Sequence, residues 1–119
     1  MTYKHFLLSE FDSPDLLNSG QKMDATFMGK LDTAREISGV PYVITSGIRT
    51  REANRAAHGV PDSAHLTGHA CDILTKDSSQ RWRILFGLIR AGFTRIGISQ
   101  EFIHVDDCPN KTPRVCWTY

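Results

Sequence analysis

The ten residues Ser63–Asp72, Ser-Ala-His-Leu-Thr-Gly-His-Ala-Cys-Asp, place the strongest constraint on the fold of this chain. Residues 70–74 are typical of a buried strand, in which successive side chains face opposite sides of a sheet. Asp72 is then a carboxylate in an apolar strand, which is costly unless it is paired or bound to a metal ion. Gly68 allows the chain to turn back before the strand and bring the imidazole of His65 beside Asp72.

A third polar group is expected from a second strand, at residues 102–105. His104 and Asp106 would face the same side of that strand. Zn²⁺ binds imidazole nitrogen and carboxylate oxygen at about 2.0–2.2 Å, and a catalytic site uses three protein ligands and one open position. We therefore expect one Zn²⁺ ion, held by His65, Asp72 and His104. Asp106 would support the site from outside the coordination sphere or compete as a ligand.

A less specific interpretation is open for each of these residues. A single histidine such as His65 is more often a satisfied core residue than a ligand, and Asp72 alone could cap a nearby backbone. The joint pattern of two histidines and a carboxylate around one buried strand is more specific than its parts. It favours the metal site.

The overall composition narrows the possible functions. A chain of 119 residues can build one modest core, so a single domain over residues 1–119 is expected. A net charge of +1 gives no electrostatic case for binding nucleic acid or an acidic membrane surface. No apolar run approaches the roughly 18–20 residues of a membrane span, so membrane insertion is not expected.

The N-terminus and the cysteines bear on location. The apolar patch at residues 6–8 is too short for a secretory signal, so we expect a cytoplasmic protein in the producing cell. Any target outside that cell would be reached after release or by another export route. Cys71 is expected to be buried, and Cys108 and Cys116 could pair if oxidised, although reduced thiols are expected.

The other segments predict an α+β fold, with helices packed on a small, mostly antiparallel sheet. Asp24 is typical of a helix N-cap, and Gly39 of the αL residue that ends a helix. Trp82 and Phe86 lie at helical spacing in the clearest amphipathic segment and are expected in the core. Helices are expected over residues 25–38, 51–57 and 78–91, and strands over residues 42–45, 70–74, 93–98, 102–105 and 115–117.

Three blocks of sequence carry a resemblance to a known family. They are Ser-Gly-Ile-Arg at 46–49, Ser-x-His-x-x-Gly-x-Ala-x-Asp at 63–72 and Phe-Ile-His-Val-Asp at 102–106, with Asn54 between the first two. Together they resemble the zinc D-Ala-D-Ala carboxypeptidases and the related L-alanyl-D-glutamate endopeptidases of phage endolysins. The resemblance implies a hedgehog/DD-peptidase fold, hydrolysis of peptidoglycan stem peptides, and His65, Asp72 and His104 as the zinc ligands.

The same resemblance suggests roles for three further residues. Arg49 would polarise the scissile carbonyl or anchor a substrate carboxylate, and its fork of donors suits either task. Ser63 would help to bind substrate. Asn54 would hold the loop that carries Arg49. The alternatives are a surface arginine in a turn and an ordinary asparagine on a helix surface.

The general base is the least constrained part of the site. Several branches of the family place an acidic residue three positions before the last histidine ligand, where this chain has Glu101. If the strand already includes Glu101, alternation turns its side chain away from His104, so the assignment requires residues 99–101 to lie in a turn. Asp106 or another group is the alternative base.

Two further questions stay open. The rival function is a zinc-stabilised cell-wall-binding or phage structural module on the same fold, without catalysis. A serine or cysteine hydrolase has little support, because Ser63 and Cys71 lack the local signatures of such nucleophiles.

The bond that is cut, between two D-alanines or between L-alanine and D-glutamate, depends on pocket loops. A monomer, phage-encoded or bacterial, is expected, with Trp117 and Tyr119 available to line a substrate groove.

Overall fold

The computed structural model describes residues 2–119, and within them five strands form one mixed sheet in the order β1-β2-β4-β3-β5. The strands are β1 (Ile44–Ser46), β2 (Ala70–Leu74), β3 (Arg95–Ile98), β4 (Phe102–Asp106) and β5 (Val115–Thr118). The pairs β1–β2, β2–β4 and β3–β4 are antiparallel, and β5 joins the edge parallel to β3. The expected α+β fold with a mostly antiparallel sheet is confirmed.

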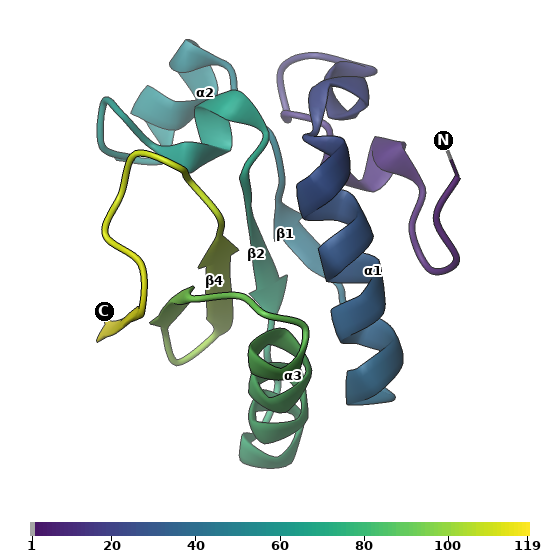
Figure 1. The fold of residues 1–119 in the computed structure, drawn as a ribbon. Helices are drawn as coiled ribbons and strands as arrows, with labels where there is room; N and C mark the ends of the chain where they lie inside the picture. Colours follow the sequence, from purple (N-terminus) through teal and green to yellow (C-terminus); the bar gives the residue numbers. More distant parts are fainter. Residues whose placement is uncertain (1) are drawn as a thin grey trace.

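Three α-helices accompany the sheet in the described residues: α1 (Ala25–Ser38), α2 (Arg51–Ala56) and α3 (Ser78–Arg90). Asp24 caps α1 by accepting a hydrogen bond from Phe27 N, and Gly39 ends it with a φ of 69°, as expected. Helices α1 and α3 pack against each other (Figure 1). Gly87 allows this close approach, because a Cβ there would lie 1.9 Å from Ser38 Oγ.

The two faces of the sheet have different chemistry. Ile73 on β2 and Ile103 on β4 point to one face, where they join the buried side chains of α1 and α3 in the core. Asp72 and His104 alternate with them and point to the opposite face. Figure 1 shows α2 near one end of the strands, away from α3, and the C-terminal segment running along the edge of the sheet. The polar site therefore lies on the face that α1 and α3 leave uncovered.

Helix α3 buries a different stripe from the one expected. Trp82 is 65% exposed and Phe86 37% exposed, so their prediction as core residues was wrong. Their rings stack on each other at 5.3 Å on the helix surface. The helix carries two apolar stripes at helical spacing, and it buries Ile84 and Leu88 instead, on the side where Gly87 permits close contact with α1.

The N-terminal third contains more structure than its composition indicated. Although residues 9–22 are rich in Ser, Asp, Pro, Asn and Gly, they contribute to two short 3-10 helices, Leu8–Phe11 and Ser19–Lys22. The first strand starts at Ile44, two residues later than expected, because Tyr42 turns into the core and shares a hydrogen bond with Ser38 Oγ. No helix within residues 2–119 is long and apolar enough to cross a membrane.

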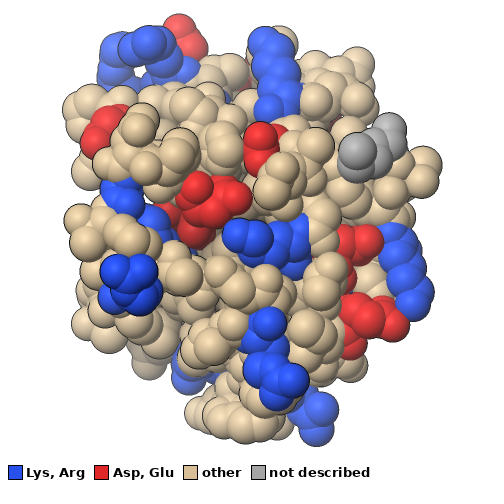
Figure 2. All heavy atoms as spheres, in the orientation of Figure 1, with Lys and Arg blue, Asp and Glu red and all other residues tan. Residues whose placement is uncertain are grey.

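Charged side chains are mixed on the molecular surface. Figure 2 shows one face, on which Lys and Arg side chains alternate with Asp and Glu rather than forming one continuous field. Cys71, Cys108 and Cys116 are free thiols, of which Cys71 is fully buried and Cys116 exposed.

Candidate metal centre

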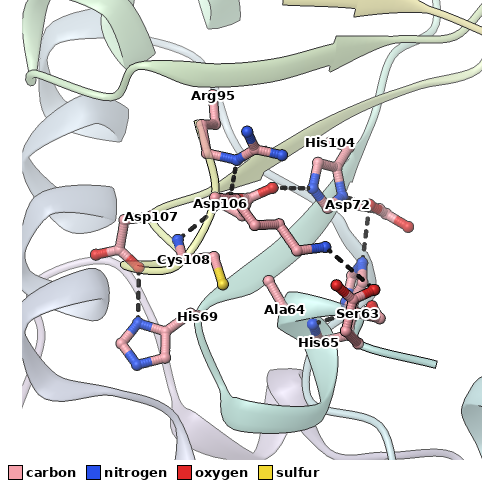
Figure 3. A network of polar contacts seen from close by, with 12 residues as sticks. Ser63, Ala64, His65, His69, Asp72, Arg95, His104, Asp106, Asp107 and Cys108 are labelled. Atoms are coloured by element: carbon pink, nitrogen blue, oxygen red, sulfur yellow. Dashed lines mark hydrogen bonds and ion pairs between the residues drawn. The ribbon is translucent and has the colours of Figure 1, made fainter. Parts of the chain in front are cut away.

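Three buried side chains from separate elements meet at one point. His65 lies in the 3-10 helix η3 (Ala64–Thr67), Asp72 in the middle of β2 and His104 in the middle of β4. Asp72 Oδ1 lies 3.3 Å from His65 Nε2 and 3.0 Å from His104 Nδ1. The candidate ligand atoms all lie within 4.8 Å of one another. The structure thus brings together the three ligands expected from the sequence (Figure 3).

The sheet register and one turn place these side chains. Asp72 and His104 are direct partners in the antiparallel β2–β4 pair, so both project from the same face. Ser63 Oγ accepts a hydrogen bond from His65 N at the start of η3. Gly68 then turns the chain into β2 with a φ of 76°, and a Cβ there would lie 2.7 Å from the backbone oxygen of Lys22. Glycine is required at this turn by both conformation and space.

Each imidazole is oriented through the nitrogen that faces away from Asp72. His65 Nδ1 donates to Gly47 O at 2.7 Å, and His104 Nε2 donates to Asp106 Oδ2 at 2.7 Å. The other nitrogen of each ring is directed at Asp72 and, when it is unprotonated, offers its lone pair to a metal ion, which is the usual arrangement of metal-ligating histidines. Tetrahedral bonds of about 2.0–2.2 Å place neighbouring ligand atoms about 3.3–3.6 Å apart, close to the distances found here. The donor set fits a zinc ion.

Asp106 supports the cluster from behind His104. Its Oδ2 accepts from the distal nitrogen of His104, and its Oδ1 accepts from Arg95 Nε at 2.7 Å. Both oxygens are therefore engaged on the side of the ring away from Asp72. Arg95 was missed in the sequence, although the register of the β3–β4 hairpin pairs it directly with Asp106.

The charges of the metal-free cluster favour an ionised Asp72. Burial alone would raise the pKa of Asp72, but hydrogen bonds from His104 and His65 outweigh it and hold the pKa below its usual range. Burial likewise acts to lower the pKa of His104, and the carboxylates of Asp106 and Asp72 outweigh it and raise the pKa. An ionised carboxylate beside two imidazoles is suited to receiving a cation.

Arg49 reaches the cluster from the loop after β1. Its Nε donates to Ser46 Oγ at 3.0 Å, and one terminal nitrogen donates to Asn54 Oδ1 at 3.2 Å. The other terminal nitrogen lies 3.5 Å from Asp72 Oδ2. Asn54 is buried, and its amide also donates to Val60 O. Asn54 is thus not a surface residue, and it fixes the direction of the guanidinium.

A cavity of about 370 Å³, here called the metal cavity, opens beside the three candidate ligands. Its wall also includes Arg49, Ser63, Trp117 and Tyr119. The Trp117 ring lies 5.5 Å from the ring of His104. A substrate group placed in this cavity would contact the ligands, the guanidinium and an aromatic wall at once.

Glu101 is not brought into this cavity. Residues 99–101 form the turn before β4, as the assignment of Glu101 as base required, and Ser99 N donates to Phe102 O across it. The Glu101 side chain is nevertheless exposed and is not among the residues that line the cavity. Its backbone oxygen accepts from Thr75 N. The role of Glu101 as base stays a prediction.

A second group of potential ligands consists of Asp24, His69 and Asp107. Asp107 Oδ1 lies 2.8 Å from His69 Nδ1, whereas Asp24 Oδ1 lies 3.9 Å from His69 Nε2. The carboxylates face opposite nitrogens of one ring, and a histidine gives a single nitrogen to one ion. This partly exposed group fits a hydrogen-bonded connection between α1, β2 and the loop after β4, separate from the metal cluster in Figure 3.

Covalent nucleophiles are poorly placed in this fold. Cys71 lies on the core face of β2, opposite to Asp72, and burial raises the pKa of its thiol well above the usual value. Ser63 Oγ accepts from His65 N rather than contacting an imidazole nitrogen. The arrangement supports metal-assisted chemistry rather than a serine or cysteine hydrolase.

Comparison with known families agrees with this geometry. The family model described as Peptidase M15 matches residues 4–106, which include all three candidate ligands and Arg49. The chain belongs to the peptidase M15 family. No curated protein matches the chain in sequence. Family membership identifies a metallopeptidase, and the buried His65, Asp72 and His104 form a group that could hold a metal ion.

Proposed function

We propose that this M15 protein is a zinc-dependent peptidase that hydrolyses an amide bond in peptidoglycan stem peptides. The observation that carries the proposal is the orientation of the two imidazoles. His65 and His104 each donate one ring nitrogen to a fixed acceptor and present the other to Asp72. A zinc ion bound there would polarise a carbonyl as a Lewis acid and activate water near neutral pH.

Arg49 is proposed to bind the oxygen of the scissile carbonyl or a substrate carboxylate. Its contacts to Ser46 and Asn54 hold the guanidinium before substrate arrives, so little reorganisation is needed when negative charge develops. The Ser63 hydroxyl lines the same cavity and would donate a hydrogen bond to the peptide. Trp117 and Tyr119 would cover the bound chain and exclude water.

Proton transfer is proposed to use Glu101. Asp106 is a poor base, because one oxygen accepts from His104 and the other from Arg95. Glu101 lies in the turn next to β4 and is exposed, so its side chain can rotate without breaking an ion pair within residues 2–119. Rotation toward the metal cavity on substrate binding would supply the base that hydrolysis requires.

The test is hydrolysis of purified peptidoglycan with and without a chelator. The zinc-loaded protein should release soluble peptides, the chelator should stop release, and added zinc should restore it. Mass spectrometry of the products would show whether the cut lies between two D-alanines or between L-alanine and D-glutamate. A zinc-loaded protein without chelator-sensitive cleavage would overturn the proposal.

The second candidate function is a wall-binding or phage structural module that holds zinc for stability alone. The exposed position of Glu101, outside the cavity wall, is the observation that favours it. A protein of this kind would bind purified cell walls and cleave none. In either function we propose a monomer that reaches the wall after release from the producing cell.

A further inference from the structure

A second and larger cavity lies next to the metal cavity. It has a volume of about 630 Å³, and its lining residues come from four segments, within 16–22, 48–51, 61–67 and 108–111. Arg49, Ser63 and Lys111 line both cavities, so the two share a wall. A peptide seated over the metal cluster could continue into this space, here called the basic cavity.

The basic cavity is strongly cationic for a chain of nearly neutral charge. Lys22, Arg49, Arg51 and Lys111 line it, and Asp62 is the single carboxylate among its lining residues. Lys111 Nζ lies 3.7 Å from Asp62 Oδ1, and that carboxylate is 80% exposed, so solvent screens the pair. Arg49 also lies 3.5 Å from the Asp72 carboxylate, so the positive charge without a nearby protein carboxylate is that of Lys22 and Arg51.

The two outer cations are free to bind a ligand. Within residues 2–119, the side chains of Lys22 and Arg51 make no ion pair or hydrogen bond with protein. On the wall shared with the metal cavity, buried Ser63 accepts from His65 N, and its own hydroxyl donates to no described protein acceptor. Lysine, arginine and hydroxyl donors around one concave site are the groups that bind carboxylates.

We propose that the basic cavity binds carboxylate groups of the peptide beside the scissile amide, so that the enzyme selects stem peptides by their negative charge. This inference rests on the proposed function and adds a substrate class to it. In a stem peptide the D-glutamate α-carboxyl lies within three residues of either possible cut, or roughly 10 Å of extended chain. The free acid is therefore preferred over the peptide in which that carboxyl is amidated to D-isoglutamine.

The test uses two synthetic pentapeptides that differ only at this carboxyl. Both are L-Ala-γ-D-Glu-L-Lys-D-Ala-D-Ala, one with a free α-carboxyl and one with an α-amide. The zinc-loaded wild type should hydrolyse the acid with a kcat/KM at least fivefold higher than the amide, chiefly through KM. A ratio below fivefold would overturn the inference, even if both peptides were cleaved.

Two double variants test whether the basic cavity causes the preference for the acid peptide. Lys22→Gln combined with Arg51→Gln should at least halve the acid-to-amide ratio. Lys76→Gln combined with Arg83→Gln removes the same charge from exposed residues outside the cavity and should leave the ratio unchanged. Equal ratios in the two double variants would contradict the assignment to this cavity.

Binding without turnover separates this inference from the proposed function. Calorimetric titration of the metal-free protein with each pentapeptide should show tighter binding of the acid, weakened by Lys22→Gln and Arg51→Gln. If neither peptide is cleaved but this pattern holds, the basic cavity is a carboxylate site and the proposed hydrolysis is wrong. If both are cleaved and bound equally, hydrolysis stands and the carboxylate site is wrong.

Discussion

The indole of Trp117 lies over Gly97, where a Cβ would be only 2.5 Å from Trp117 Nε1. The two residues are paired across the parallel β3–β5 edge. The indole also lies 5.5 Å from the ring of His104 and 5.2 Å from the guanidinium of Arg95. Because Gly97 has no side chain, Trp117 can lie over it and form part of the wall of the metal cavity.

Replacement of Gly97 by alanine should displace that wall. We expect Gly97→Ala to raise KM for stem peptides roughly tenfold, a loss of about 1.4 kcal/mol of binding free energy, with a shift in tryptophan fluorescence. Gly29→Ala is the matched control, because a Cβ on this α1 residue meets nothing within 4 Å. It should stabilise the fold by up to about 1 kcal/mol without changing KM. An unchanged KM in Gly97→Ala would show that Trp117 does not shape the substrate site.

The hydrogen bond from Arg49 to Asn54 should matter for turnover. Arg49→Lys keeps the charge but loses the fork of donors, and we expect kcat to fall by about 10²-fold or more. Asn54→Ala should lower kcat/KM about tenfold, because the guanidinium loses one of its fixed partners. Steady-state kinetics with zinc content measured in parallel would check both. A kcat near the wild-type value in Arg49→Lys would contradict a role in charge stabilisation.

Glu101→Gln separates the two candidate functions. If Glu101 transfers the proton, kcat should fall by about 10²–10⁴-fold while zinc content and thermal unfolding stay unchanged, because the side chain is exposed. Glu10→Gln, at another exposed carboxylate, is a control for the loss of charge. Equal activity in Glu101→Gln and the wild type would assign the base elsewhere, and an inactive wild type that binds cell walls would favour the module.

The buried Tyr42, away from the metal site, should make the free energy of unfolding depend on pH. Burial raises the pKa of Tyr42 to about 12, whereas the unfolded side chain titrates near 10. Between these values the unfolded chain releases a proton that the folded chain retains, so stability is lost as pH rises. Tyr42 should contribute a slope of about 1.4 kcal/mol per pH unit in that window. Urea unfolding at pH 9 to 12 should show a steeper decline for wild type than for Tyr42→Phe, and equal slopes would contradict this.

Much of the metal cluster could be predicted because alternation along a strand is strict. Asp72 and His104 occupy the middle of adjacent antiparallel strands, and the turn at Gly68 brings His65 beside them. The hairpin register would also have revealed Arg95 opposite Asp106. Short turns set the position of His65 and the β3–β4 pairing. Helix α3 and strand β3 separate β2 from β4 in the chain, so alternation predicts the outward face of Asp72 and His104 but not their pairing.

Features set by tertiary packing could not be predicted in this way. Trp82 and Ile84 both lie on apolar stripes of α3, and close contact with α1 at Gly87 decides which stripe is buried. The parallel pairing that brings Trp117 to Gly97 follows a long loop after β4, whose register no local signal specifies. The direction of the Glu101 side chain depends on its turn rather than on strand alternation.

Metal content is the most direct test of the zinc site. The purified protein is dialysed with zinc and then against metal-free buffer, and its zinc content is measured by mass spectrometry. His65→Gln and His69→Gln, which change one histidine in each candidate group, are treated in the same way. We predict about one zinc ion per chain in the wild type and in His69→Gln, and less than about a tenth of that in His65→Gln. A wild type without zinc, or zinc lost in His69→Gln and kept in His65→Gln, would contradict the assignment.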